Sequence, residues 1–138
     1  MKASGGCLCG AVRYEIDGEP IFSGHCHCRD CQRATGTGHV SVIAMPRAAV
    51  KITGETRAYT SNGDSGQPLT RNFCPNCGSL IFSQPSVMGD VANVTAGTLD
   101  DPSIFQPQAA IYTSRRPHWD HIQGALMEFE TVPPRPPG

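Results

Sequence analysis

The sequence predicts an all-β domain built from short strands with little helix. Glycine contributes 15 of the 138 residues and proline 12, and both residue types mark turns and interrupt helices. Hydrophobic residues make up only 38% of the chain, which favours many turns and short strands over long helices. A chain of this length fits one domain with a buried core. We therefore expect a single domain over residues 1–130, followed by a Pro-rich, mobile tail at residues 131–138.

The individual strands are predicted from segments that alternate apolar and polar side chains or are rich in β-branched residues. Residues 11–16 alternate apolar and polar side chains, as a half-buried strand does. The turn at Gly54-Glu55 predicts a hairpin between the strands that flank it. Residues 29–34 and 101–105 are expected to form single helical turns, and residues 61–68 a polar loop. Strands are expected at residues 11–16, 21–28, 39–45, 50–53, 56–60, 69–73, 80–83, 91–97 and 109–113.

Charge and hydropathy restrict the location and the partners. The formal net charge is −1, so the chain lacks the basic excess that attracts nucleic acid. No apolar run approaches the roughly 20 residues that span a bilayer. Residues 1–6 lack the apolar stretch of a signal peptide. We expect a cytoplasmic protein without a membrane or nucleic-acid partner, in a compartment that keeps thiols reduced. The sequence does not indicate the oligomeric state.

Four of the seven cysteines form two pairs with the spacing of a structural zinc site. Cys7 and Cys9 are two residues apart, and on an extended segment they would point to the same side. Cys74 and Cys77 belong to a CPNCG turn between two expected strands, where Gly78 permits an unusual backbone angle. Together they supply the four thiolates of a closed tetrahedral site. Disulfides are the weaker interpretation, because the number of cysteines is odd.

The remaining three cysteines predict a second site with an open position. Cys26, Cys28 and Cys31 leave one vacancy on tetrahedral zinc, as in catalytic sites. A histidine could instead complete a second structural site, and His39 is the freest candidate. In another grouping, Cys28 and Cys31 join Cys74 and Cys77 as a zinc ribbon. The first grouping predicts two Zn²⁺ per chain.

The ligand set indicates the chemistry of the open site. Thiolates already neutralise the ion, so such zinc is a weaker Lewis acid than zinc bound by neutral histidines. It suits the capture of a soft sulfur ligand better than the production of hydroxide. The spacing therefore favours a thiol substrate over simple hydrolysis.

These motifs occur together in one known family. The ordered segments are residues 6–10 (GCLCG), 26–31 (CHCRDC), 73–78 (FCPNCG), 97–102 (GTLDDP) and 117–120 (PHWD). With them the sequence resembles the glutathione-dependent formaldehyde-activating enzymes, also called the centromere-protein-V type, over about residues 3–130. The resemblance implies a β-tent zinc fold of several short antiparallel sheets, the grouping of four and three cysteines, and a carbon–sulfur lyase that handles S-hydroxymethylglutathione.

The chemistry that the resemblance implies needs a proton donor and carboxylate-binding groups. His27, His39 and His118 are candidate proton donors, since histidine exchanges protons near neutral pH. The candidates for binding the carboxylates of glutathione are Arg29, Arg115 and Arg116. Trp119 is expected to fill the core.

Two functions compete at this point. The first is an enzyme that forms or cleaves an adduct between an aldehyde and glutathione or another thiol. The second is a non-catalytic zinc module that binds a thiol ligand or a protein partner, and an exposed apolar patch near the open site would support it.

Overall fold

The computed structural model of the chain describes residues 1–124 and 126–133. Two sheets contain nearly all of the regular structure, and one short α-helix lies beside them, which confirms the all-β prediction. The smaller sheet has the order β1 (Lys2–Gly6), β2 (Arg13–Asp17) and β5 (Val50–Thr53). The larger sheet has eight strands.

The larger sheet extends from β11 at one edge to β6 at the other. Its strands are, in spatial order, β11 (Met127–Glu128), β10 (Ala109–Ile111), β3 (Phe22–Cys26), β4 (Val40–Pro46), β9 (Val91–Thr95), β8 (Leu80–Pro85), β7 (Pro68–Phe73) and β6 (Arg57–Asn62). Strand β10 runs parallel to both of its neighbours, β3 and β11. The structure thus has two sheets, one of them long and mixed, where several short antiparallel sheets were expected.

The helical segments are short. The α-helix α1 (Arg29–Thr35) begins at the Cys28 N-cap and ends at the Gly36 C-cap. Five 3₁₀ turns occur in the described part of the chain, at Arg47–Ala49, Ser86–Met88, Ala96–Thr98, Pro102–Ile104 and Thr113–Arg115. The two helical turns expected from the sequence correspond to α1 and to Pro102–Ile104. No helix of the described residues is long and apolar enough to cross a membrane.

The predicted hairpin around Gly54-Glu55 does not form. Strand β5 pairs with β2 in the small sheet, while β6 pairs with β7 in the large one. The chain does bend at Gly54, but it uses this bend to pass from one sheet to the other. Strand β5 pairs with a strand much earlier in the chain, and β6 pairs with the strand that follows it. These two pairings replace the hairpin between β5 and β6.

The main core lies where the small sheet meets the large one. In β2 the alternation of the sequence appears as alternating burial, and Tyr14 and Ile16 point inward. They pack with fully buried side chains of the large sheet such as Ile43 and Ile81. Cys74 belongs to the same cluster. The four-cysteine group is therefore attached to the core that joins the two sheets.

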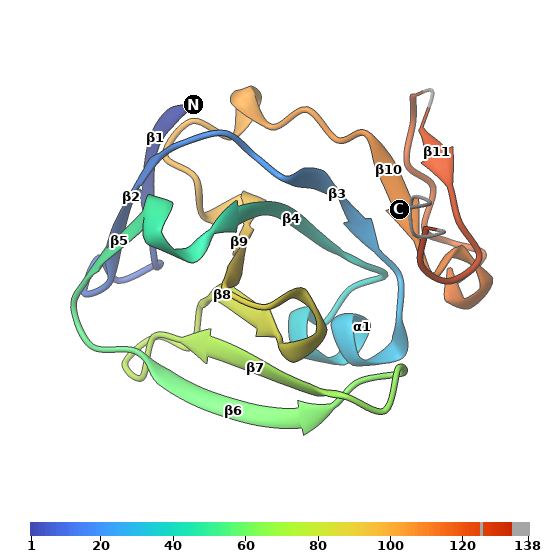
Figure 1. Ribbon diagram of the computed structural model, residues 1–138, viewed down its shortest axis with the longest axis horizontal. Coiled ribbons are helices and arrows are strands. Elements are labelled where there is room, and N and C mark those ends of the chain that lie inside the picture. Colours follow the sequence, from blue (N-terminus) through green and yellow to red (C-terminus); the bar gives the residue numbers. More distant parts are fainter. Residues whose placement is uncertain (125, 134–138) are drawn as a thin grey trace.

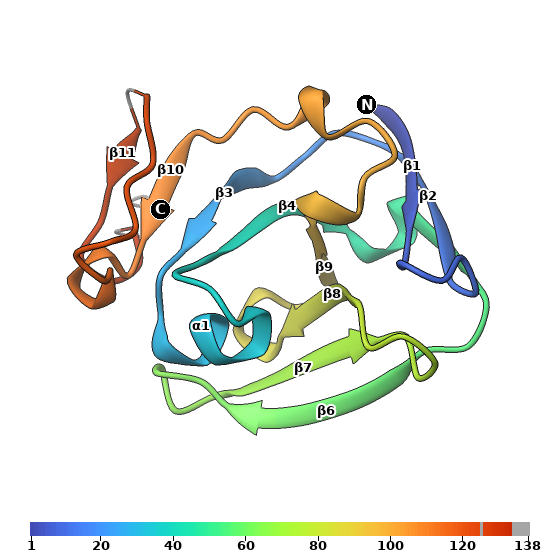
Figure 2. The same ribbon diagram turned by 180° about the vertical axis from the view of Figure 1, so that it is seen from behind.

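The large sheet bends around α1. In Figures 1 and 2 it passes from β3 and β4 over β9 and β8 to β7 and β6, and α1 lies inside this bend. The segment between β9 and β10 crosses from the small sheet, where Leu99 bridges Gly5, to the edge of β3. The bend brings the β3–α1 junction to face β7 and β8, and the second cysteine group lies at that junction.

The expected tail is described only in part. The main-chain N–H of Tyr112 donates to the carbonyl of Thr131 over 2.9 Å. Residues 134–138, which complete the predicted mobile tail, lie outside the described residues.

Candidate metal centre

Four cysteine sulfurs meet beside the main core. The Sγ atoms of Cys7, Cys9, Cys74 and Cys77 lie within 4.8 Å of one another. The distance from Cys9 Sγ is 3.6 Å to Cys7 Sγ and 3.8 Å to Cys74 Sγ. A disulfide bond needs about 2.05 Å, whereas a tetrahedral ion with Zn–S bonds of about 2.3 Å separates its sulfurs by about 3.8 Å. The observed distances fit a shared metal ion.

Two turns hold these four cysteines in place. The loop after β1 closes through the Cys7 N–H, which donates to the Val12 carbonyl over 3.0 Å, and the Val12 N–H points at Cys7 Sγ over 3.2 Å. Cys7 and Cys9 therefore lie in a turn, not on the extended segment expected. In the second turn the Gly78 N–H donates to the Cys74 carbonyl at 2.8 Å, and Gly78 takes φ +80°, which favours glycine.

Ser79 connects the two turns. Its Oγ accepts a hydrogen bond from the Leu8 N–H over 3.0 Å and lies 3.3 Å from Cys77 Sγ. Its hydroxyl can therefore donate to the sulfur while it accepts from the other turn. This contact with Ser79 is the main cause that lowers the pKa of Cys77 to about 5. A lowered thiol pKa favours the thiolate that a metal ion binds.

The other three cysteines meet at the junction of β3 and α1. The Sγ atoms of Cys26, Cys28 and Cys31 lie within 4.8 Å of one another, and no histidine joins their group among the described residues. Cys26 ends β3, Cys28 is the N-cap of α1, and Cys31 lies in the first helical turn. The Cys31 N–H donates to Cys28 Sγ over 3.3 Å. Hydrogen bonds from the neighbouring thiols, first Cys26, lower the pKa of Cys28 to about 3.

The structure therefore brings the cysteines together as four and three. The ribbon grouping, in which Cys28 and Cys31 would join Cys74 and Cys77, is not formed. All seven cysteines are free of disulfide bonds. Both groups offer the soft thiolate donors that zinc binds, at spacings that suit one ion each.

A pocket of about 370 Å³ opens beside the three-cysteine group. Cys26, Cys28 and Cys31 line it, together with residues of β4, β7, β8 and β9. Cys28 and Cys31 are themselves part of an apolar cluster with Val40 and Val42. A ligand in this pocket would reach the three sulfurs through apolar surroundings.

Arg71 and Tyr112 line this pocket beside the cysteines, and neither was among the candidates from the sequence. The Arg71 guanidinium on β7 lies 4.0 Å from Cys31 Sγ. Tyr112 packs against the three-cysteine cluster and has a left-handed backbone with φ 54°. Such a conformation is uncommon for a residue with a bulky side chain and is often found at functional sites. Neither residue belongs to a spacing pattern, so only the fold brings them to the cysteines.

Two of the three candidate histidines, His27 and His39, contact Asp120 and do not line the pocket. His27 is fully buried, and its Nδ1 is 3.2 Å from the Gly38 carbonyl and 3.0 Å from Asp120 Oδ2. His39 Nδ1 is 2.9 Å from the same carboxylate oxygen. Because both partners of His27 are acceptors, its proton lies on Nδ1. Burial lowers the pKa of His27 and, to about 4, that of His25.

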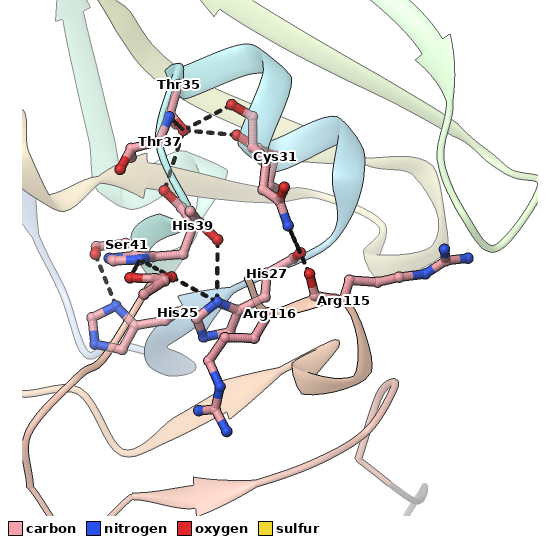
Figure 3. Close-up of polar contacts among 12 residues, drawn as sticks. His25, His27, Cys31, Thr35, Thr37, His39, Ser41, Arg115 and Arg116 are labelled. Atoms are coloured by element: carbon pink, nitrogen blue, oxygen red, sulfur yellow. Dashed lines mark hydrogen bonds and ion pairs between the residues drawn. The ribbon is translucent and has the colours of Figure 1, made fainter. Parts of the chain in front are cut away.

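Figure 3 shows the imidazoles of His25, His27 and His39 gathered beside Ser41. His25 and His39 meet edge to face with ring centroids 4.9 Å apart. The ligand atoms of His27, His39 and Asp120 are also close enough to bind one metal ion. The hydrogen bond from His39 to Asp120 and the contact between His27 and Asp120 explain this closeness without an ion. Gly38 is required at this place, because a Cβ atom there would collide with the Asp120 carboxylate.

The remaining candidates lie outside the pocket lining. His118 and Arg29 are exposed, and Arg29 contacts Gln32. Arg116 pairs with Glu128 over 2.5 Å, and the Arg115 carbonyl accepts from the Gln32 amide over 3.0 Å. Trp119 is 59% exposed, so the expectation that it fills the core is wrong. It lies in a short segment next to buried Asp120, and the carboxylate is the inward-facing group.

Comparisons with known proteins place the chain in one family and show that its fold is known. The model of the family described as glutathione-dependent formaldehyde-activating enzyme matches residues 2–115. A Halomonas elongata protein whose name carries the same description is 23% identical over 129 residues, covering 89% of this chain and 82% of that protein. The crystal structure of a Rhodobacter sphaeroides protein shares the fold, with a TM-score of 0.57 and 19% identity over 70% of this chain and 87% of that one.

Proposed function

Because the chain belongs to the glutathione-dependent formaldehyde-activating enzyme family, we propose that it is a zinc-dependent carbon–sulfur lyase. It forms or cleaves an adduct between a thiol and an aldehyde, such as S-hydroxymethylglutathione. The observation that carries the proposal is the three-cysteine group at the β3–α1 junction, whose sulfurs line a pocket large enough for a small molecule.

The proposal assigns different work to the two cysteine groups. Cys7, Cys9, Cys74 and Cys77 would bind one zinc ion as a closed set that ties the β1–β2 loop to the β7–β8 turn. Cys26, Cys28 and Cys31 would bind a second ion and leave one position free on the pocket side. A zinc ion bound there would lower the pKa of a substrate thiol and hold the sulfur as a thiolate.

The reaction joins two molecules without an oxidant. The thiolate sulfur attacks the aldehyde carbon, a carbon–sulfur bond forms, and the π electrons of the carbonyl move to its oxygen. That oxygen then takes up a proton to give the hydroxyl of the adduct, and cleavage follows the same steps in reverse.

Two pocket residues suit this chemistry. Tyr112 packs against the cysteine cluster and carries a hydroxyl that can donate to the developing alkoxide. Arg71, close to Cys31, can attract an anionic substrate group and favour the thiolate form of the sulfur. Catalytic roles for His27, His39 and His118, and glutathione contacts by Arg29, Arg115 and Arg116, stay predictions. So do the cytoplasmic location and the lack of a nucleic-acid partner.

Contacts among His27, His39 and Asp120 hold the loop that carries Cys26 and Cys28. Asp120 accepts a hydrogen bond from His39 and lies 3.0 Å from His27 Nδ1, and the Gln32 amide donates to the His27 carbonyl over 2.8 Å. His27 lies between Cys26 and Cys28 in the chain, so these contacts fix the loop that carries two of the three sulfurs. In this arrangement His27 and Asp120 are positioning residues.

The test is exchange NMR between formaldehyde and its glutathione adduct, recorded with and without the zinc-loaded protein. We expect exchange cross-peaks to grow with protein concentration and to fall about 10- to 100-fold in Tyr112→Phe, the range of general acid catalysis. Tyr59→Phe, on exposed β6, is the matched control. An exchange rate equal to the spontaneous rate with glutathione and with other thiols would refute the proposed activity.

One observation favours the alternative of a non-catalytic module that binds a thiol or a protein. Val87, Met88 and Val132 are exposed apolar residues that line the same pocket. Apolar side chains gathered on a surface often mark a binding site. Saturable heat on titration with a thiol, combined with no acceleration of exchange, would identify the chain as such a module.

A further inference from the structure

The pocket beside the three cysteines is lined mainly by apolar side chains. Val40, Val42, Phe22 and Leu80 contact the cysteine cluster directly. The apolar lining also includes Ile111, which pairs with Cys26 in the sheet, and Pro68, Leu69, Pro85, Val87, Met88 and Val132. A ligand attached to sulfur in this pocket would bury its nearest carbon atoms against hydrocarbon.

The pocket offers one fixed positive charge. Among its described lining residues, Arg71 is the single arginine or lysine. It has no carboxylate partner within 4.0 Å in the described part of the chain. The acidic residues in the lining are Asp30 and Asp64. Arg71 is therefore the one side chain of the described lining that can bind an anionic group through a full positive charge.

Glutathione is less well matched to this mainly apolar lining than a ligand with one anionic group. It carries two carboxylates, one ammonium group and two peptide bonds, and each polar group that loses water needs a partner. Arg71 can satisfy one carboxylate, whereas the other donors of the described lining, such as Ser65, Gln67 and Asn93, are neutral. Buried polar groups without partners weaken binding strongly.

We propose that the preferred adduct carries an apolar group next to its sulfur-bearing carbon and a single anionic group that Arg71 binds. This inference rests on the proposed function, and it names the substrate class of the same site. The apolar group can come from the aldehyde or from the thiol, and both give the same buried hydrocarbon. The rim residues Val87, Met88 and Val132 would cover its far end.

The first experiment measures binding without any reaction. Straight-chain alkanoates from butanoate to octanoate are titrated into the zinc-loaded protein by calorimetry, with the matching alkanols as neutral probes. Burial of each added methylene should tighten binding about fourfold. Dissociation constants that do not change with chain length would overturn the apolar part of the proposal.

Arg71→Met tests the anionic part. Loss of a hydrogen bond to a charged group should weaken octanoate at least about tenfold and leave octanol unchanged. Arg57→Met is the matched control, because Arg57 is exposed on β6 and lies outside the pocket lining. If Arg71→Met and Arg57→Met bind octanoate alike, Arg71 is not the anion-binding residue.

The second experiment compares turnover by exchange NMR. One arm keeps glutathione and replaces formaldehyde with propanal and pentanal, and the other keeps formaldehyde and replaces glutathione with 3-mercaptopropanoate and 6-mercaptohexanoate. If the aldehyde supplies the apolar group, kcat/KM should rise about fourfold per methylene in the aldehyde series. If the thiol supplies it, the same rise should appear in the thiol series.

The outcomes separate this inference from the proposed function. Acceleration that is greatest for glutathione with formaldehyde would overturn the inference and leave the function intact. No acceleration in any arm, together with alkanoate binding that tightens with chain length, would refute the enzyme and support the pocket chemistry.

Discussion

The substitution Asp120→Asn tests the buried network behind the cysteine loop. Asp120 is 8% exposed, accepts a hydrogen bond from His39 Nδ1 over 2.9 Å, and lies 3.0 Å from His27 Nδ1. Hydrogen bonds to a charged group contribute about 1.5–3 kcal/mol, against about 0.5–1.5 kcal/mol for neutral pairs. Asparagine keeps the shape but removes the charge, so weakening the hydrogen bond to His39 and the contact with His27 should cost about 2–3 kcal/mol. For a domain of this size we expect the melting temperature to fall by about 10 °C.

Differential scanning calorimetry of the zinc-loaded protein measures this change. Asp17→Asn is the matched control, because Asp17 is exposed at the end of β2. Substitutions of exposed side chains usually change stability little, so the control should shift the melting temperature far less. Equal shifts in the two variants would show that Asp120 does not support the loop as described.

Three further predictions concern the core, the closed cysteine group and the response to high pH. Burial raises the pKa of Tyr14, so above about pH 10 the unfolded chain releases its phenolic proton before the folded chain does. The unfolded chain then binds fewer protons, so the unfolding free energy should fall as the pH rises beyond about 10. Urea titrations at several pH values should show this fall in the wild type and not in Tyr14→Phe. If the unfolding free energy of both proteins falls equally with pH, Tyr14 is not its cause. Ser79→Ala should weaken metal binding by the four-cysteine group about 10- to 100-fold in chelator competition, as loss of a supporting hydrogen bond does elsewhere, whereas exposed Ser86→Ala should not. Ile43→Ala should lower the unfolding free energy by about 2–5 kcal/mol, since Ile43 is fully buried, while Ile21→Ala, which is 55% exposed, should have a much smaller effect.

Local pattern was enough to predict much of this fold. The alternation of residues 11–16 reflects the one-sided burial of β2, and the glycine-bearing CPNCG turn lies between two strands as expected. Two strands were missed, β1 (Lys2–Gly6) and the two-residue β11 (Met127–Glu128). Strand β1 is polar and rich in glycine, so it has no strand pattern. It forms because β2 and the Gly5–Leu99 bridge supply partners, and such long-range pairing is not visible in a local window.

The cysteine spacing was informative for a physical reason. Residues two or three apart must stay close in almost any turn, so each pair remained together although Cys7 and Cys9 lie in a loop. Arg71, Tyr112 and Asp120 reach the site only because the large sheet bends and the segment after β10 returns to it. No sequence spacing predicts such contacts.

Metal analysis of the wild type beside two single variants tests the central claim most directly. The wild type should bind two zinc ions per chain, one of them readily removed by a chelator. Cys28→Ser should stay folded and lose only the labile ion. Cys74→Ser should unfold, because a structural zinc ion supplies about 10–16 kcal/mol of binding energy, which is comparable to the total stability of a domain. A single ion in the wild type, or equal unfolding of both variants, would contradict the division into a closed and an open site.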